Sequence, residues 1–239
     1  MSDLQHARAI LQAAKKVLVI TGAGISAESG IPTFRGEGGY WRGLRAEELA
    51  SPEGFKKNPK LVWDWYCERR ELVAQAKPNA AHLALADWSK RREGVSLLTQ
   101  NVDDLHERAG QPDTVLLHGS IWKNRCRACG FEHRVQELAY AELPHCPCCD
   151  AIIGPGVVWF GESLKFESFH SLNLGCIEAD AILVIGTSGL VSPTADFIHR
   201  AREKYKTPLI NVNPTESNVP ATIELRLKAA ECIPELVVK

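Results

Sequence analysis

The 239-residue sequence predicts an α/β fold, namely a Rossmann-like doubly wound parallel sheet with a small inserted zinc-binding module and a small helical insert. Two observations predict the sheet. Short continuous apolar runs alternate with helical stretches, a pattern typical of parallel strands buried on both faces. The first of these runs leads through a glycine turn into the start of a helix. A third observation, a cluster of cysteines in the second half of the chain, predicts the metal-binding insert.

The expected strands are four apolar runs, which cover residues 16–20, 95–98, 181–185 and 209–212. Helices are expected over 80–88, where Asn79 is a suitable N-cap, and over 196–205. Two segments interrupt this alternation. Residues 37–76 contain a glycine-rich loop followed by a helical run from Lys60 to Ala76, and residues 123–152 contain the cysteine cluster.

Composition restricts the class of protein further. Apolar residues make up 45% of the chain, charged residues 24%, and the net charge is −1. This balance argues against a protein built mainly to bind nucleic acid, so no sequence-specific nucleic-acid partner is expected. No apolar run reaches the roughly 18–20 residues needed to cross a bilayer, and the polar start lacks a signal-peptide pattern. We therefore expect no membrane association and a cytoplasmic location.

Five of the eight cysteines lie between Cys126 and Cys149. Cys126 and Cys129 form one C-x-x-C pair, and after sixteen residues Cys146 and Cys149 form a second. Two such pairs can surround one Zn²⁺ tetrahedrally, and four thiolates leave no position for water, so the metal is expected to be structural. Cys148 is an alternative fourth ligand, although the matching spacing favours Cys149. The remaining alternative is a group of reduced cysteines without metal.

The segment Gly22–Ala27 (GAGISA) follows the first expected strand and fits the pattern G-x-G-x-x-(G/A) of dinucleotide-binding turns. A tight structural turn is an equal alternative, because the pattern alone is weak. Dehydrogenases also place an acidic residue about 20 positions further on, at a strand end. Glu47 and Glu48 lie near that distance but in a helix-like stretch, so a dinucleotide here is expected to be held differently.

Polar or small residues also follow the other three apolar runs, at Thr99–Asp103 (TQNVD), Gly186–Ser188 (GTS) and Asn211–Asn213. His118-Gly119 follows a further short apolar stretch at 115–117. The carboxyl ends of parallel strands meet at one edge of a sheet, so these segments predict one shared ligand crevice. Ordinary turn chemistry, and a structural role for the histidine, are the alternatives.

Taken together, these motifs resemble the sirtuin family of NAD-dependent protein-lysine deacylases. The resemblance rests on GAGISAESGIPTFRG at 22–36, TQNVD, the HG pair, the paired cysteines, GVVWFGE at 156–162 and GTS. The motifs occur in the family's order and cover roughly Val17 to Pro234. The sequence departs from the family at Leu227-Lys228-Ala229, at Thr194 and at Asn213-Pro214, and the first and last of these departures bear on adenosine contacts.

The resemblance implies NAD as co-substrate, one structural Zn²⁺ on Cys126, Cys129, Cys146 and Cys149, and His118 as general base. In the family's reaction the acyl oxygen displaces nicotinamide from ribose, and His118 would then take a proton from a ribose hydroxyl. The products would be free lysine, nicotinamide and O-acyl-ADP-ribose. The implied NAD-binding residues are Gly22, Ala23, Gly24, Ser26, Phe34, Arg35, Tyr40, Trp41, Gln100, Asn101, Val102, Asp103, Gly186, Thr187, Ser188, Asn211, Val212, Asn213 and Ala230.

The substrate side is implied in the same way. Val157, Trp159 and Phe160 would form the edge along which the backbone of an acylated protein adds as a strand. Tyr66 and Arg69 are three residues apart and share a helix face, and a phenol with a guanidinium can bind a carboxylate. In the family, Tyr-x-x-Arg at this place resembles members that remove succinyl, malonyl or glutaryl groups. The alternative is a surface pair that covers an apolar face.

The resulting domain prediction is a Rossmann-like NAD-binding domain over 1–36, 78–122 and 153–239, a helical insert with cofactor loop over 37–77, and a zinc module over 123–152. The predicted function is a desuccinylase and demalonylase that also removes acetyl groups from protein lysines. Alternatives are an enzyme that is mainly a deacetylase, an ADP-ribosyltransferase using the same NAD cleavage, a nicotinamide dehydrogenase, and a zinc-ribbon binding module. The sequence gives no oligomeric state.

Overall fold

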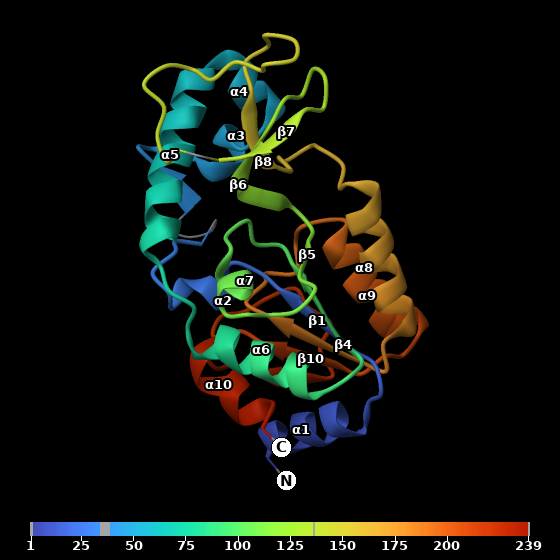
Figure 1. Cartoon of the computed structure of the whole chain (residues 1–239). Helices are drawn as coiled ribbons and strands as arrows, with labels where there is room; N and C mark the ends of the chain where they lie inside the picture. Colours follow the sequence, from blue (N-terminus) through green and yellow to red (C-terminus); the bar gives the residue numbers. More distant parts are fainter. Residues whose placement is uncertain (1, 34–38, 136, 239) are drawn as a thin grey trace.

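The computed structural model describes residues 2–33, 39–135 and 137–238. A larger part contains a parallel sheet with helices packed around it, and a smaller part lies beyond one edge of that sheet (Figure 1). Both chain ends lie at the end of the larger part that is farthest from the smaller one (Figure 1). No helix in the described residues combines the length and the apolar composition required to span a bilayer.

The sheet has six strands in the order β11-β10-β9-β1-β4-β5, and every neighbouring pair is parallel. Its central strands are continuous apolar runs because both faces are covered. The first strand after the N-terminal helix lies in the middle, and the chain adds strands on both sides of it, which confirms the doubly wound fold. The strands are β1 (Val17–Thr21), β4 (Val95–Thr99), β5 (Val115–Leu116), β9 (Ala181–Ile185), β10 (Leu209–Val212) and β11 (Ile223–Leu225).

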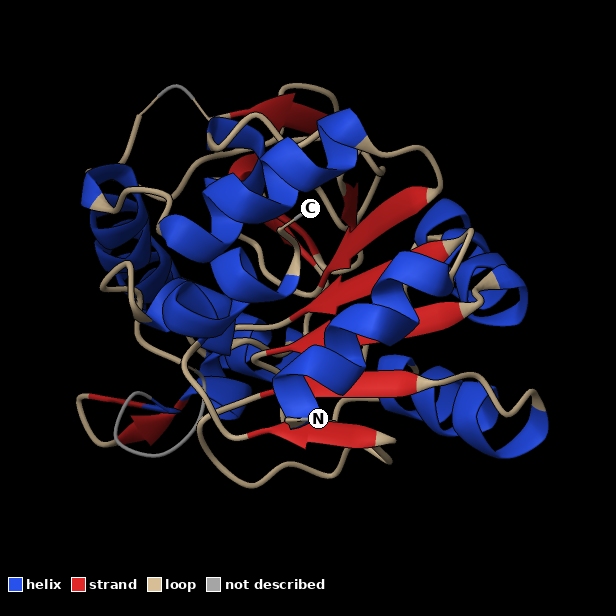
Figure 2. Ribbon diagram, turned by 90° about the horizontal axis from the view of Figure 1, so that it is seen from below, coloured by secondary structure: helices blue, strands red, loops and turns tan. Residues whose placement is uncertain are grey.

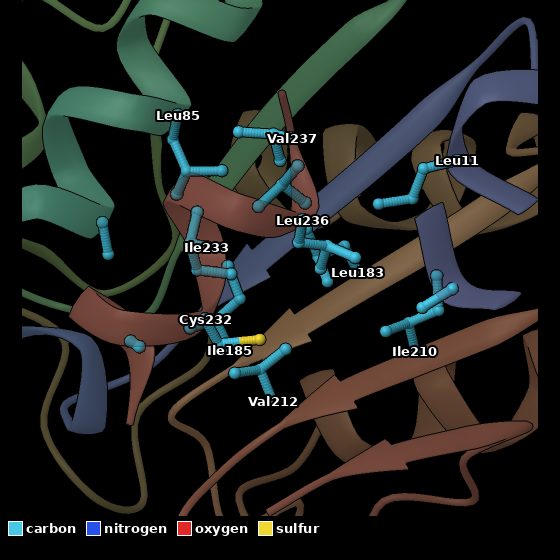
Figure 3. Close-up of a cluster of buried hydrophobic side chains, with 14 of the residues drawn as sticks. Leu11, Leu85, Leu183, Ile185, Ile210, Val212, Cys232, Ile233, Leu236 and Val237 are labelled. Atoms are coloured by element: carbon cyan, nitrogen blue, oxygen red, sulfur yellow. The ribbon is translucent and has the colours of Figure 1, made fainter. Parts of the chain in front are cut away.

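Helices cover the two faces of the sheet separately (Figure 2). Alternate side chains of β1 show this division, since Val17 and Val19 belong to one buried cluster and Leu18 and Ile20 to another. Figure 3 shows the first cluster, in which Ile233 and Leu236 lie over Leu183 and Ile185. One face carries α1 (Asp3–Ala13), α6 (Ala80–Arg91) and α10 (Ala229–Leu236), and the other carries α8 (Phe166–Glu178) and α9 (Thr194–Lys204).

The smaller part combines two segments that are distant in the sequence. The first supplies β2 (Tyr40–Trp41), β3 (Leu44–Arg45), α3 (Ala46–Leu49), α4 (Pro52–Lys57) and α5 (Pro59–Gln75), and the second supplies β6 (Gly119–Arg125), β7 (Glu132–Arg134) and β8 (Gly154–Val157). Antiparallel pairing places β6 between β7 and β8. Fully buried Arg70 on α5 joins the two segments, because it donates hydrogen bonds to the Ile121 carbonyl (2.9 Å) and to Asn124 Oδ1 (2.7 Å).

Two short helices follow strands of the sheet at its carboxyl edge. These are α2 (Gly24–Ala27), which follows β1, and α7 (Leu105–Arg108), which follows β4. Both lie where the larger part faces the smaller one (Figure 1).

Candidate functional site

A cavity of about 500 Å³ lies at the carboxyl edge of the sheet, between the larger and the smaller part. The sheet contributes segments that follow five of its strands, and the smaller part contributes the residues after β8. The structure thereby brings together the strand-end motifs that the sequence singles out. The lining includes Gly22–Gly24, Gln100–Val102, His118, Gly186–Ser188, Asn213, Thr215 and Glu216 from the larger part, and Tyr66 and Val157–Glu162 from the smaller part.

The glycines after β1 allow two strand-end loops to touch. The Gly24 N–H donates to the Gly186 carbonyl at 2.8 Å. A Cβ atom on Gly24 would lie 2.7 Å from Gly186 Cα, and one on Gly22 would lie 2.9 Å from the Gly186 carbonyl oxygen. The loops after β1 and β9 therefore form one continuous floor for the cavity, and any side chain at these glycines would separate them.

His118 follows β5 and lines this cavity. Its Nδ1 lies 2.9 Å from the carbonyl oxygen of Gln100. A carbonyl only accepts hydrogen bonds, so Nδ1 carries the proton and Nε2 of the neutral ring keeps a lone pair. Burial lowers the pKa of His118, an effect that the hydrogen bond to Gln100 partly offsets. The ring is therefore neutral at physiological pH and can accept a proton at Nε2.

A second, smaller cavity adjoins the first and shares Ala23, Asn101 and Val102 with it. Ser26 connects its polar groups: Ser26 Oγ donates to Asp103 Oδ2 (3.0 Å) and accepts from Asn101 Nδ2 (3.1 Å). Burial raises the pKa of Asp103, whereas hydrogen bonds from the Leu105 N–H and from Ser26 lower it. This pocket, whose volume is only about 10 Å³, presents an amide and a carboxyl group that can hydrogen-bond a polar group entering from the main cavity.

Tyr66 and Arg69 are both buried, so they are not a surface pair. Tyr66 lines the main cavity and Arg69 lines the smaller one. The Tyr66 hydroxyl accepts a hydrogen bond from Trp159 Nε1 at 3.1 Å, and burial raises its pKa to about 12, so it remains a proton donor. Burial also lowers the pKa of Arg69, whose guanidinium lies 5.3 Å from the centre of the Trp65 ring.

The four cysteines of the two C-x-x-C pairs form one cluster, with all Sγ atoms within 4.8 Å of one another. The distances Cys126–Cys149 and Cys129–Cys146 are both 3.5 Å, close to the roughly 3.8 Å edge of a tetrahedral zinc–thiolate site. Cys126, Cys129, Cys146 and Cys149 therefore fit a structural zinc ion, which they would hold with no open coordination position.

Several predicted residues lie elsewhere. Exposed Tyr40 and partly buried Trp41 lie on the β2–β3 hairpin, Asn211 is buried within β10, and the Ala230 N–H donates to Glu28 Oε2 (2.9 Å). Neither these residues nor Val212 line either cavity in the described part of the chain, and Phe34 and Arg35 fall outside that part.

Sequence reasoning overlooked Thr215, Glu216 and Glu162, all of which line the main cavity. The position of the turn directly after β10 is the signal that would have indicated Thr215 and Glu216.

A dinucleotide-sized cavity lies at the switch edge of a doubly wound sheet and is closed on its other side by Tyr66 and Val157–Glu162 of the smaller part. With the four-cysteine cluster carried by that smaller part, this defines a Rossmann-like nucleotide-binding protein with a structural metal lobe. Comparisons with known proteins narrow this class. The Sir2 family model matches residues 22–193, and the chain belongs to this family.

Relatives and solved structures match over nearly the whole chain. An NAD-dependent protein deacylase of Pyrococcus furiosus is 44% identical over 235 residues, covering 95% of this chain and 94% of the relative. A crystal structure of a Sir2 homologue–NAD complex is 42% identical with a TM-score of 0.91, covering 98% of this chain and 92% of the other. A Sir2 homologue mutant in complex with 2′-O-acetyl ADP ribose is 41% identical with a TM-score of 0.92, covering 99% and 95%.

Proposed function

We propose that this chain is an NAD-dependent protein-lysine deacylase that prefers succinyl and malonyl groups and also removes acetyl groups. The observation that carries the proposal is the His118 ring, whose Nδ1–H is fixed on the Gln100 carbonyl inside a cavity bounded by the strand-end loops and the Val157–Glu162 segment. Family membership and the NAD and acetyl-ADP-ribose complexes of similar proteins support the NAD-dependent deacylase activity.

The residues divide between the two substrates. The loops at Gly22–Gly24 and Gly186–Ser188 would hold NAD, while Ser26, Asn101 and Asp103 would receive its nicotinamide end. The edge at Val157–Phe160 would take the peptide backbone. NAD supplies an activated ribose carbon when bound, and His118 Nε2 would accept the proton of a ribose hydroxyl.

The acyl preference rests on Tyr66 and Arg69. Tyr66 is buried at the main cavity and Arg69 at the smaller one that adjoins it, and burial raises the pKa of the phenol and lowers that of the guanidinium. The charge of Asp103 already offsets part of the cost of burying this guanidinium, and an acyl carboxylate would add charge-assisted hydrogen bonds to it. An acetyl group offers no such compensation, so an acidic acyl group should be favoured.

The decisive test is a panel of peptides carrying acetyl-, succinyl-, malonyl- and glutaryl-lysine, read by mass spectrometry with and without NAD. We expect NAD-dependent loss of the acyl mass and release of nicotinamide, with higher kcat/KM for the acidic groups. Arg69→Met should lower kcat/KM for succinyl-lysine about tenfold or more, because a charge-assisted hydrogen bond contributes roughly 1.5–3 kcal/mol, and should change acetyl turnover far less.

Three outcomes would contradict the proposal in different ways. An equal fall for both acyl groups in Arg69→Met would refute the acyl preference alone. A gain of ADP-ribose mass on a target protein would indicate ADP-ribosyl transfer, and formation of reduced cofactor would indicate a dehydrogenase.

We further propose acylated lysine side chains of proteins as partners and the cytoplasm as the location. All eight cysteines are unpaired by disulfides, and a thiolate metal cluster is typical of a reducing compartment.

A further inference from the structure

Arg127 lies inside the first C-x-x-C pair, between Cys126 and Cys129. A residue at this place on a metal knuckle would be expected to point to solvent. The Arg127 side chain is instead only 21% exposed, because it crosses from the zinc module to the segment that follows β8. Among the described residues of the module, Arg127 alone makes a network of side-chain hydrogen bonds with the chain around the proposed peptide edge.

The guanidinium contacts the Val157–Glu162 segment at the first and at the last of its residues. Arg127 Nε donates to Glu162 Oε1 (2.8 Å), and Nη2 donates to Glu162 Oε2 (3.2 Å) and to the Val157 carbonyl (3.0 Å). The guanidinium carbon lies 3.2 Å from the centre of the Trp159 ring. A paired carboxylate, a carbonyl and an aromatic face thus surround a single cation.

These contacts continue toward the cavity. Glu162 Oε2 also accepts from the Trp159 backbone N–H (2.8 Å), and the Trp159 indole N–H donates to the Tyr66 hydroxyl (3.1 Å). On the other side, the Val158 N–H donates to the His118 carbonyl (2.8 Å). The segment therefore contacts the Tyr66 hydroxyl through Trp159, and Arg127 is its main polar support on the zinc-module side.

We propose that Arg127 is a positioning residue that holds Val157–Glu162 in the conformation that receives the acyl-lysine peptide. Through Trp159 it also orients the Tyr66 hydroxyl. The inference rests on the proposed function, since it assigns this segment to peptide binding. Arg127 touches neither substrate itself; it acts by linking the zinc knuckle to the peptide edge.

The test compares Arg127→Gln with Arg125→Gln, a matched control. Arg125 is in the same module and pairs with Glu132 (3.7 Å), away from the segment. We expect Arg127→Gln to raise the KM for succinyl-lysine peptide about tenfold, with the KM for NAD within about twofold of wild type, because one charge-assisted network is lost. Arg127→Lys should recover only part of the loss, since an ammonium keeps the charge without the bidentate geometry.

Hydrogen exchange supplies a readout that needs no substrate. The amides of Val158 and Trp159 should exchange about tenfold faster in Arg127→Gln than in Arg125→Gln, with zinc content equal in both variants. Combining Arg127→Gln with Glu162→Gln should weaken peptide binding no more than the stronger single change, because both remove the same network.

Equal exchange in Arg127→Gln and the control, or additive effects in the double variant, would overturn the inference. A wild-type chain that leaves every acyl-lysine peptide intact would overturn the proposed function instead, and the exchange comparison would still report on the segment.

Discussion

Two buried histidines should make the protein acid-sensitive. His82 on α6 and His106 on α7 lie with ring centres 4.9 Å apart. His106 Nε2 is 2.9 Å from Thr21 Oγ1, and His82 Nδ1 accepts from the Asn79 N–H. Their other ring nitrogens, His82 Nε2 and His106 Nδ1, have no hydrogen-bond partner among the described residues. Protonating either ring would place an uncompensated cation in the interior.

The magnitude follows from the pKa values. Burial lowers the pKa of His82 to about 4 and that of His106 to about 3, the latter with a contribution from the charge of His82. An unfolded histidine has a pKa of about 6.5, so below that pH the unfolded chain binds more protons than the folded chain. Stability therefore falls as pH falls from about 6.5 toward 4 and 3. Each histidine should cost about 2 kcal/mol between pH 7 and pH 5, at about 1.4 kcal/mol per pH unit.

The assay is urea unfolding of wild type and His82→Gln at pH 7 and pH 5, at equal total zinc. Glutamine keeps a hydrogen-bond acceptor for the Asn79 N–H but does not titrate. Wild type should lose about 2 kcal/mol more than the variant between the two pH values. Loss of zinc in acid and titration of carboxyl groups affect both proteins alike, so the comparison removes them.

The same loss of unfolding free energy in wild type and His82→Gln would refute the reasoning. It would mean that His82 binds protons as readily in the folded chain as in the unfolded chain, which the burial of its ring should prevent.

Three further predictions concern the site. The lowered pKa of His118 should place the acid limb of kcat/KM below pH 6.5, because the base stays neutral to lower pH, and a limb above 6.5 would contradict the assigned base. Gly24→Ala should lower the unfolding free energy by about 1–3 kcal/mol and weaken NAD binding, because the alanine Cβ would lie 2.7 Å from Gly186 Cα. Calorimetry measures both effects, and unchanged values would contradict that packing. Chelation of zinc should lower Tm and speed hydrogen exchange around Cys126 and Cys146, with recovery on adding Zn²⁺, whereas an unchanged Tm would show that the cluster needs no metal.

The sheet was predictable because its central strands carry a strong local signal. The apolar runs at 181–185 and 209–212 coincide with β9 and β10, and the run at 16–20 is displaced by one residue at each end from β1. The helical run predicted from Lys60 to Ala76 is α5, displaced by one residue at each end. Continuous burial on both faces leaves a strand with few polar residues, so composition alone reveals it.

Elements that depend on distant contacts were not predictable. The strand β8 contains Gly-Pro-Gly-Val, which has no alternating pattern, and it is a strand because β6 pairs with it. The helix α10 contains Pro234, a residue that ordinarily argues against a helix interior. The same reason hides the contact of Arg127 with Trp159, because no local pattern links a metal knuckle to a segment some thirty residues later.

The zinc module leaves and rejoins the fold through neighbouring strands. Arg125 at the end of β6 is paired with Gly154 at the start of β8, so everything between them begins and ends at one place (Figure 1). The segment between these two residues can gain or lose length at little cost in conformational entropy, about 0.6 kcal/mol for each doubling of a flexible loop. Natural variation in this stretch would reshape the outer surface of the module while the dinucleotide crevice retains its form.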